Sequence, residues 1–309
     1  MHVVRKPWGS TDLRPWSDKH DDVRVGELWF QRTTIAAPSS ALLLKLLFTN
    51  ERLSIQVHPD DAFARSIGLD HGKTEAWYIL SAAPDAKIAV GLKRQLTTPQ
   101  FRASIEDGTI SDLIQWRGVR KDDFIFVPAG TIHAIGAGLV IAEIQQRSDT
   151  TFRLFDYGRQ RELHVDHAVA VANAGPEESQ PAPRRLTEAR TMLVASPPFV
   201  LERIDLAANS SWELRADHET WLLVLEGNAR IGPLNPCVGE AIFLDAVRTE
   251  IETGASGLMG LVAYVGPAQN PDLLTDLGQD VESRIGRFPR PSVHHRTTAG
   301  TQAAAEALT

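Results

Sequence analysis

The stretch DDFIFVPAGTIHAIGAG, residues 122–138, carries the clearest indication of the fold. Its apolar residues at 123–128 predict a short strand, and Pro128 with Gly130 predicts a turn directly after it. His133 follows this turn. The run LVIAEIQQ at 139–146 predicts a further strand. The stretch therefore predicts two short strands joined through a turn, with a histidine just beyond the turn.

The same pattern of short strands continues on both sides of this stretch. Two helices are expected between them, at 98–108 with Thr98 as N-cap and Pro99 first inside, and at 162–175 ending at Gly175. Many short strands at close spacing predict a sandwich or barrel. The other strands expected in this half lie at 41–48, 53–58, 75–80, 87–92 and 151–157.

A polar segment with three prolines, PEESQPAPRR at 176–185, predicts a break in the chain. We expect one domain at 1–175, a linker at 176–198, a smaller β domain at 199–270 and a partly disordered tail at 271–309. Strands of the smaller domain are expected at 199–206, 221–231, 241–246, 249–253 and 257–265.

Composition excludes several classes of protein. The 309 residues carry a net charge of -7, without the basic balance typical of nucleic-acid binding. No apolar run approaches the ~18 residues that span a membrane, and the N-terminus lacks the apolar core of a signal peptide. Cys237 is the single cysteine, so neither an internal disulfide nor a thiolate zinc cluster can form. We expect a cytoplasmic protein without nucleic-acid or membrane partners.

The segment LSIQVHPDD at 53–61 alternates apolar and polar residues before Pro59. Residues two apart on a strand share a face, so Leu53, Ile55 and Val57 are expected on one face. Ser54, Gln56 and His58 are expected together on the other face. Pro59 cannot donate to a strand ladder and is expected to end the pairing.

Three separate segments supply groups that suit one divalent metal ion. They are Gln56 with His58, then Glu75 in GKTEAWYIL, and His133 after the Pro-x-Gly turn. Imidazole and carboxylate bind zinc at about 2.0–2.2 Å. Each residue alone is more often structural, and only their combination points to a metal site.

The combination resembles a known family. Pro128-Ala129-Gly130 followed by His133 resembles the second metal-binding motif of the cupin barrel. With KPWGS, VGELWF, LSIQVHPDD, GKTEAWYIL, TFRLFDYGR and ELHVDHA in order, the chain resembles the short bacterial type I mannose-6-phosphate isomerases. This resemblance implies a mainly β fold of two cupin (jelly-roll) β-barrels with a few helices. The second barrel, which offers His218 but no later partner, is expected to be metal-free.

The resemblance also implies roles for single residues. It implies one zinc ion per chain, held by Gln56, His58, Glu75 and His133. The catalytic residues that it implies are Arg153, Lys73 and Glu143, and the substrate-binding residues are Ser54, Lys73 and Arg153.

The implied reaction interconverts mannose 6-phosphate and fructose 6-phosphate through an enediol. Lys73, with a pKa expected to fall near zinc and arginine, and Glu143 are both candidates for the base. The alternatives are an iron or manganese cupin oxygenase or decarboxylase, and a sugar-binding cupin without catalysis.

Outside the site, structural roles are expected for His164 and His167, a structural or phosphate-facing role for Arg159, and no function for His294 and His295. The sequence leaves the oligomeric state open.

Overall fold

The computed structural model describes residues 1–17, 23–32 and 39–278. The expected tail lies mostly beyond these residues, and so do His294 and His295. None of the helices in the described part is both long and apolar enough to cross a membrane.

The first half of the chain forms two antiparallel sheets. Sheet A has the order β1-β2-β3-β10-β5-β8, and sheet B has the order β11-β4-β9-β6-β7. The strands of sheet A are β1 (His2–Ser10), β2 (Val25–Trp29), β3 (Leu42–Thr49), β5 (Glu75–Ala82), β8 (Phe124–Val127) and β10 (Leu139–Gln146). Those of sheet B are β4 (Ile55–Val57), β6 (Lys87–Leu92), β7 (Ile114–Gly118), β9 (His133–Ile135) and β11 (Phe152–Phe155).

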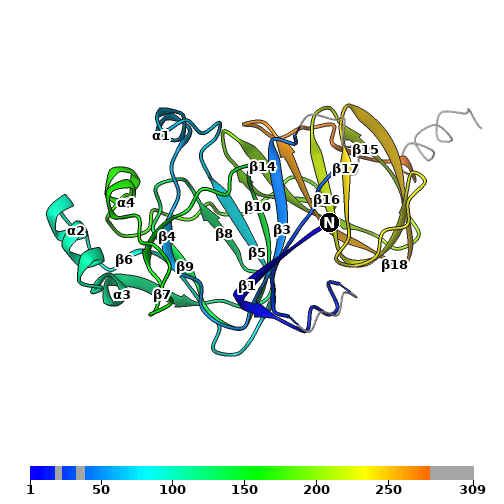
Figure 1. The fold of residues 1–309 in the computed structure, drawn as a ribbon. Helices are drawn as coiled ribbons and strands as arrows, with labels where there is room; N and C mark the ends of the chain where they lie inside the picture. Colours follow the sequence, from blue (N-terminus) through cyan, green and yellow to red (C-terminus); the bar gives the residue numbers. More distant parts are fainter. Residues whose placement is uncertain (18–22, 33–38, 279–309) are drawn as a thin grey trace, which may run out of the picture.

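Short helices lie beside sheet B at one end of the molecule, with α1 set apart from the others (Figure 1). Apolar residues of α2, α3 and α4 pack with Ile55, Val57 and Leu154 in one core cluster, so these helices cover the outer face of sheet B. The helices are α1 (Asp61–Ser66), α2 (Thr98–Glu106), α3 (Ile110–Leu113) and α4 (Val165–Val171).

The second half forms one further antiparallel sheet, sheet C. The long strand β18 pairs with β15 along its first part, with β14 along its second part, and with β16. The strands are β12 (Arg184–Arg185), β13 (Arg190–Ala195), β14 (Phe199–Leu206), β15 (Ser211–Ala216), β16 (Thr220–Ile231), β17 (Ala241–Leu244), β18 (Val247–Val265) and β19 (Leu274–Asp276).

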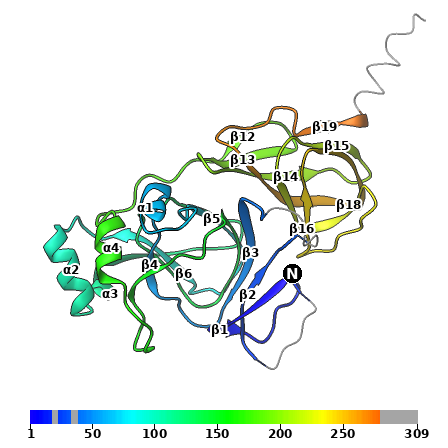
Figure 2. The same ribbon diagram turned by 45° about the horizontal axis from the view of Figure 1, so that its top comes forward.

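Sheet A is the middle layer of the molecule (Figures 1 and 2). Alternate residues of β3 face opposite ways. Leu44 and Leu46 pack with Leu201 and Trp221 of sheet C, whereas Leu47 packs with Trp77 in the cluster between sheets A and B. Both faces of β3 are thus buried, which explains its nearly continuous apolar sequence.

The prediction of a mainly β fold is confirmed, whereas closure into two barrels stays a prediction. The strands expected at 249–253 and 257–265 form one strand, β18. Gly257 has φ +70, and a Cβ there would lie 2.5 Å from the Leu206 oxygen, so glycine lets the strand bend and continue. The segment 176–198, assigned to a linker by the sequence, contains β12 and β13.

The two expected helices form, with shifted ends. Thr97 rather than Thr98 caps α2, and its side chain accepts from the Gln100 amide in a capping box. The second helix, α4, is shorter than expected because the amide of Asn173 bonds to Gly130 rather than continuing the helix.

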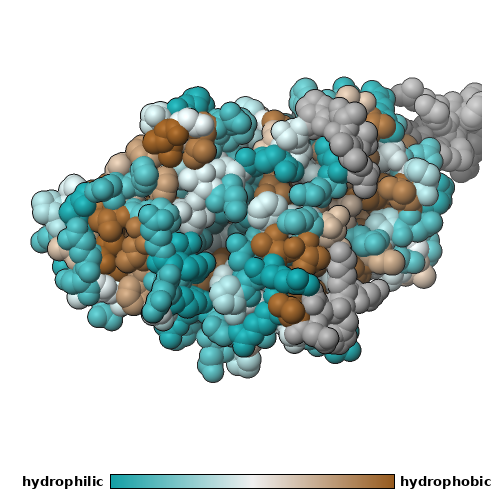
Figure 3. Space-filling view, in the orientation of Figure 1, coloured by the Kyte–Doolittle hydropathy of each residue, from teal (hydrophilic) through white to brown (hydrophobic). Residues whose placement is uncertain are grey.

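The face seen in Figure 3 is largely hydrophilic, with separate hydrophobic patches over α1 and between α2 and α4. Ile67 and Leu69, directly after α1, are 39% and 37% exposed. Patches of this limited kind are normal on globular proteins.

Candidate active site

Sheet B places three of the expected site residues in one row. Gln56 on β4 lies opposite Arg153 on β11 and opposite His133 on β9. Directly opposed residues of antiparallel strands share a face, and His58, two residues beyond Gln56, shares it too. The sequence-based placement of Leu53 with Ile55 is wrong: β4 begins only at Ile55, and Leu53 packs in the cluster between the sheets.

The chain turns immediately after His58. Strand β4 ends before Pro59, and the Asp60 carboxylate then accepts from the Phe63 amide at 2.7 Å as the N-cap of α1. The Gly130 amide donates to the His58 carbonyl at 2.8 Å, with Gly130 at φ +84. These contacts fix the histidine beside the turn that precedes β9.

Glu75 reaches the same point from sheet A. Its Oε2 lies 3.5 Å from His58 Nε2, and its Oε1 lies 3.4 Å from His133 Nε2. The Lys73 ammonium is 3.2 Å from Glu75 Oε2, and the Lys73 amide donates to the Pro59 carbonyl at 2.9 Å. The two sheets therefore bring the carboxylate between two imidazoles and beside a lysine.

Hydrogen bonds orient both imidazoles. His58 Nδ1 lies 2.8 Å from the Thr150 carbonyl oxygen, and His133 Nδ1 lies 2.9 Å from that of Thr131. A carbonyl only accepts, so each Nδ1 carries the proton and each Nε2 keeps a free lone pair. In the part of the chain that the structure describes, His58 Nε2 is buried without a hydrogen-bond partner, and Glu75 Oε2 is buried with only its ion-pair contacts to Lys73 and His58. Buried nitrogen and oxygen atoms whose lone pairs accept no hydrogen bond suit a metal ion.

The spacing of these atoms agrees with that interpretation. The two Glu75 oxygens lie 3.5 and 3.4 Å from the imidazole nitrogens of His58 and His133, close enough for one ion at about 2.0–2.2 Å from its ligands to contact all three side chains. Within the described residues, His58, Glu75 and His133 are the one set of three such side chains close enough to share an ion. Gln56 Nε2 lies 3.2 Å from His133 Nε2, and a half-turn of the amide places its oxygen there as a further ligand.

Burial and nearby charges set the ionisation states of the two imidazoles and the carboxylate to those that bind a metal ion. Burial, with the charge of Lys73, lowers the pKa of His58 to about 3, and burial lowers that of His133. Burial opposes ionisation of Glu75, yet Lys73 and His58 outweigh it and hold its pKa well below the usual range. Neutral imidazoles and an ionised carboxylate result, as metal binding requires.

A cleft of about 380 Å³ adjoins this cluster. Its lining includes Ser54, Gln56, Lys73, Glu143 and Arg153, so the structure gathers the expected catalytic and substrate residues in one place. Ser54 is 3% exposed, and its hydroxyl donates to the Gln56 amide oxygen at 3.1 Å.

Sequence reasoning missed two charged residues in this cleft. Lys45 on β3 lies 3.3 Å from Glu143 Oε1 and 3.6 Å from Glu27 Oε2, and all three are buried. The signal was present in ALLLKLLF, because a buried charge inside an apolar strand requires a partner. Glu143 therefore pairs with Lys45.

The pKa values of the two candidate bases diverge. Burial and the charge of Glu75 raise the pKa of Glu143 to about 6, although Lys45 opposes the shift. Burial favours neutral Lys73, but Glu75 and Glu143 overcome it and raise its pKa above the ordinary value. The lowering of the Lys73 pKa expected near zinc and arginine stays a prediction, since the protein's own carboxylates act in the opposite direction.

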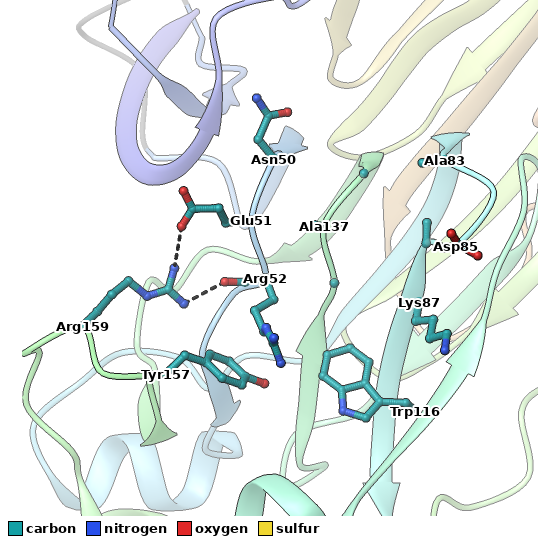
Figure 4. A pocket seen from close by; sticks show the side chains of 13 residues that line it. Asn50, Glu51, Arg52, Ala83, Asp85, Lys87, Trp116, Ala137, Tyr157 and Arg159 are labelled. Atoms are coloured by element: carbon teal, nitrogen blue, oxygen red, sulfur yellow. Dashed lines mark hydrogen bonds and ion pairs between the residues drawn. The ribbon is translucent and has the colours of Figure 1, made fainter.

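Arg159 lies apart from the cleft. It lines a groove of about 930 Å³, donates to the Arg52 carbonyl at 2.7 Å and lies 4.0 Å from Glu51. Figure 4 shows Tyr157 and Trp116 on opposite sides of this groove. His167 stacks on Phe152 outside both cavities, whereas His164 lines the cleft.

Comparisons with known proteins agree with this geometry. A mannose-6-phosphate isomerase of Streptococcus mutans is 37% identical over 198 residues, 62% of each chain. One of Bacillus subtilis is 42% identical over 137 residues, 42% of this chain and 43% of the relative. The chain is related to the mannose-6-phosphate isomerases. This confirms the resemblance expected from the motifs, although the chain spans less than two thirds of the length of these curated relatives. No family model matches the chain.

Solved mannose-6-phosphate isomerases share the fold. The crystal structure from Bacillus subtilis matches with a TM-score of 0.68 and 24% identity, covering 85% of this chain and 96% of that one. A variant from Salmonella typhimurium matches with a TM-score of 0.67 and 16% identity, covering 86% and 98%.

Proposed function

We propose that the protein is a zinc-dependent aldose–ketose isomerase that interconverts mannose 6-phosphate and fructose 6-phosphate. One observation carries the proposal: the buried cluster of His58, Glu75 and His133 touches Gln56 and Lys73, which line the cleft. Related chains named mannose-6-phosphate isomerase support the choice of reaction.

Gln56, His58, Glu75 and His133 would hold one zinc ion. When bound, zinc supplies Lewis-acid stabilisation of negative charge on substrate oxygens. The carboxylate neutralises one of its two charges, and the two imidazoles and the amide are neutral. The proposed site therefore keeps a net positive charge.

The chain's own residues would then move the proton between neighbouring sugar carbons. Glu143 is our candidate base, because a pKa of about 6 leaves it ionised at neutral pH and still basic enough to accept a proton. Lys73 remains the rival proton carrier. Arg153 and Lys73 would bind the anionic substrate, and the Ser54 hydroxyl, which donates to the Gln56 amide oxygen, would accept from the amide N–H after the half-turn.

A coupled assay tests the proposal. We expect conversion of mannose 6-phosphate that a chelator abolishes and added zinc restores, together with about one zinc per chain by elemental analysis. Absence of turnover in fully metal-loaded protein would reject the isomerase. Oxygen consumption or carbon dioxide release would instead favour an oxygenase or a decarboxylase.

We also propose a cytoplasmic location and no nucleic-acid or membrane partner. The net charge of -7 supports the absence of such partners, because polyanions and acidic membranes attract basic surfaces. Binding to DNA in a gel-shift assay, or to anionic vesicles in sedimentation, would contradict it.

A further inference from the structure

His164 and Arg153 hold each other through two backbone contacts. The Arg153 amide donates to His164 Nδ1 at 3.1 Å, and the His164 amide donates to the Arg153 carbonyl at 2.9 Å. The Arg153 guanidinium also donates to the Glu162 carbonyl at 2.7 Å. Residues 162–164 are thereby fixed against β11. The side chains of Arg153 and His164 both line the cleft.

The first contact selects the tautomer of His164. A backbone amide can only donate, so Nδ1 is the unprotonated nitrogen, and in the neutral ring the proton is on Nε2. Among the described residues Nε2 has no hydrogen-bond partner. Burial and the charge of Arg153 lower the pKa of His164, which favours this neutral form. The ring therefore offers one N–H donor that the protein leaves unused.

The charged residues near this N–H donor indicate which kind of ligand it would bind. Within the described chain Arg153 has no carboxylate at ion-pair distance, and its Nε is buried without a partner. Arg161 also lines the cleft, and its guanidinium donates two hydrogen bonds of 2.6 Å to the carboxylate of the buried Asp156. Glu162, exposed to solvent, is the acidic residue nearest along the chain, and Glu27, Glu143 and Asp149 also line the cleft. Two guanidinium groups and a neutral N–H donor suit a phosphate.

We propose that His164 binds the phosphate of the substrate through Nε2–H, beside Arg153 and Arg161, with the Arg153 amide fixing its tautomer. The inference rests on the proposed function for the identity of the substrate. It gives His164 a binding role in place of the structural role expected from the sequence. Arg159, which shares Asp156 with Arg161, lies in the neighbouring groove (Figure 4) and takes no part.

Two substitutions separate binding from structure. His164→Asn keeps a polar atom near the Nδ1 position and removes the distal donor. His164→Gln keeps a donor near the Nε2 position and gives up the contact with the Arg153 amide. His167→Asn is the matched control, because His167 lies within α4, whose N-cap is His164, and stacks on Phe152.

We expect His164→Asn to raise KM for mannose 6-phosphate about tenfold with kcat changed less than about twofold, since a hydrogen bond to a charged group contributes about 1.5 kcal/mol or more. The affinity for inorganic phosphate, measured by calorimetry, should fall by a similar factor. His164→Gln should recover most of the loss, and His167→Asn should leave both quantities unchanged. Long-range proton–nitrogen NMR of the wild-type imidazole should show the proton on Nε2.

An unchanged phosphate affinity in His164→Asn, or a proton on Nδ1, would overturn the inference. A loss in His164→Gln equal to that in His164→Asn would show that the distal donor does not account for the binding and would also overturn the inference. Phosphate binding is measured without turnover. If the wild type fails to isomerise mannose 6-phosphate, the proposed function falls, while the phosphate titrations still decide the role of His164.

Discussion

Replacing Lys45 by methionine would remove the cation that restrains the pKa of Glu143. The two groups are 3.3 Å apart and both are buried. At an effective dielectric constant of about 20, Coulomb attraction over this distance amounts to about 5 kcal/mol, which sets an upper bound of about 4 pKa units. Glu27 and Lys73 also surround the carboxyl, so we expect a smaller rise of at least about one unit.

The expected rise in the Glu143 pKa predicts the direction in which the kcat–pH profile moves. Glu143, with a pKa of about 6 in the parent protein, would ionise only at higher pH in Lys45→Met. If ionised Glu143 is the base, the acid limb of the kcat–pH profile moves to higher pH by at least about one unit. Lys6→Met is the matched control, because Lys6 lies 3.5 Å from Glu27 in the same cleft and has no ion pair with Glu143.

The expected rise in the Glu143 pKa also predicts how the pH dependence of stability changes. The pKa of Glu143 lies above its ordinary 4.5, so its contribution to stability is fully present below pH 4.5 and is lost as the pH rises through about 6. In Lys45→Met this loss should continue to higher pH, so urea midpoints at pH about 5 and about 8 should differ more than in the parent. An unmoved acid limb together with an unchanged midpoint difference would refute the reasoning.

Two further predictions concern single arginines. Arg153→Ala should abolish turnover while zinc content, measured by elemental analysis, is retained; loss of zinc would point to a structural role instead. Arg190→Met should lower the free energy of unfolding by about 3–5 kcal/mol, because it leaves the Glu202 carboxylate, 2.8 Å away and fully buried, without its partner. Arg230→Met breaks an exposed pair with Glu252 and an exposed hydrogen bond to the Gly232 carbonyl, and it should cost less than about 1 kcal/mol in the same urea titration. Equal effects would contradict this.

Local patterns in the sequence predicted most strands and the residues of the candidate metal cluster. Strands β6, β10 and β14 lie at the residues expected from their apolar runs. His58 and His133 were found because a polar residue beside a strand end or turn is visible in a short window. Local sequence also marked the glycine and proline positions that end or turn the strands, since these depend on backbone geometry alone.

Only the tertiary structure decided which faces meet. Lys45 and Glu143 are 98 positions apart in the sequence, and they pair because β3 and β10 are neighbours in sheet A. The unused donor of His164 depends on the backbone of Arg153 on another element. The shifted pKa values follow from burial and from charges brought together by folding. Such properties arise from distances between segments remote in the chain, and a sequence pattern contains no such distances.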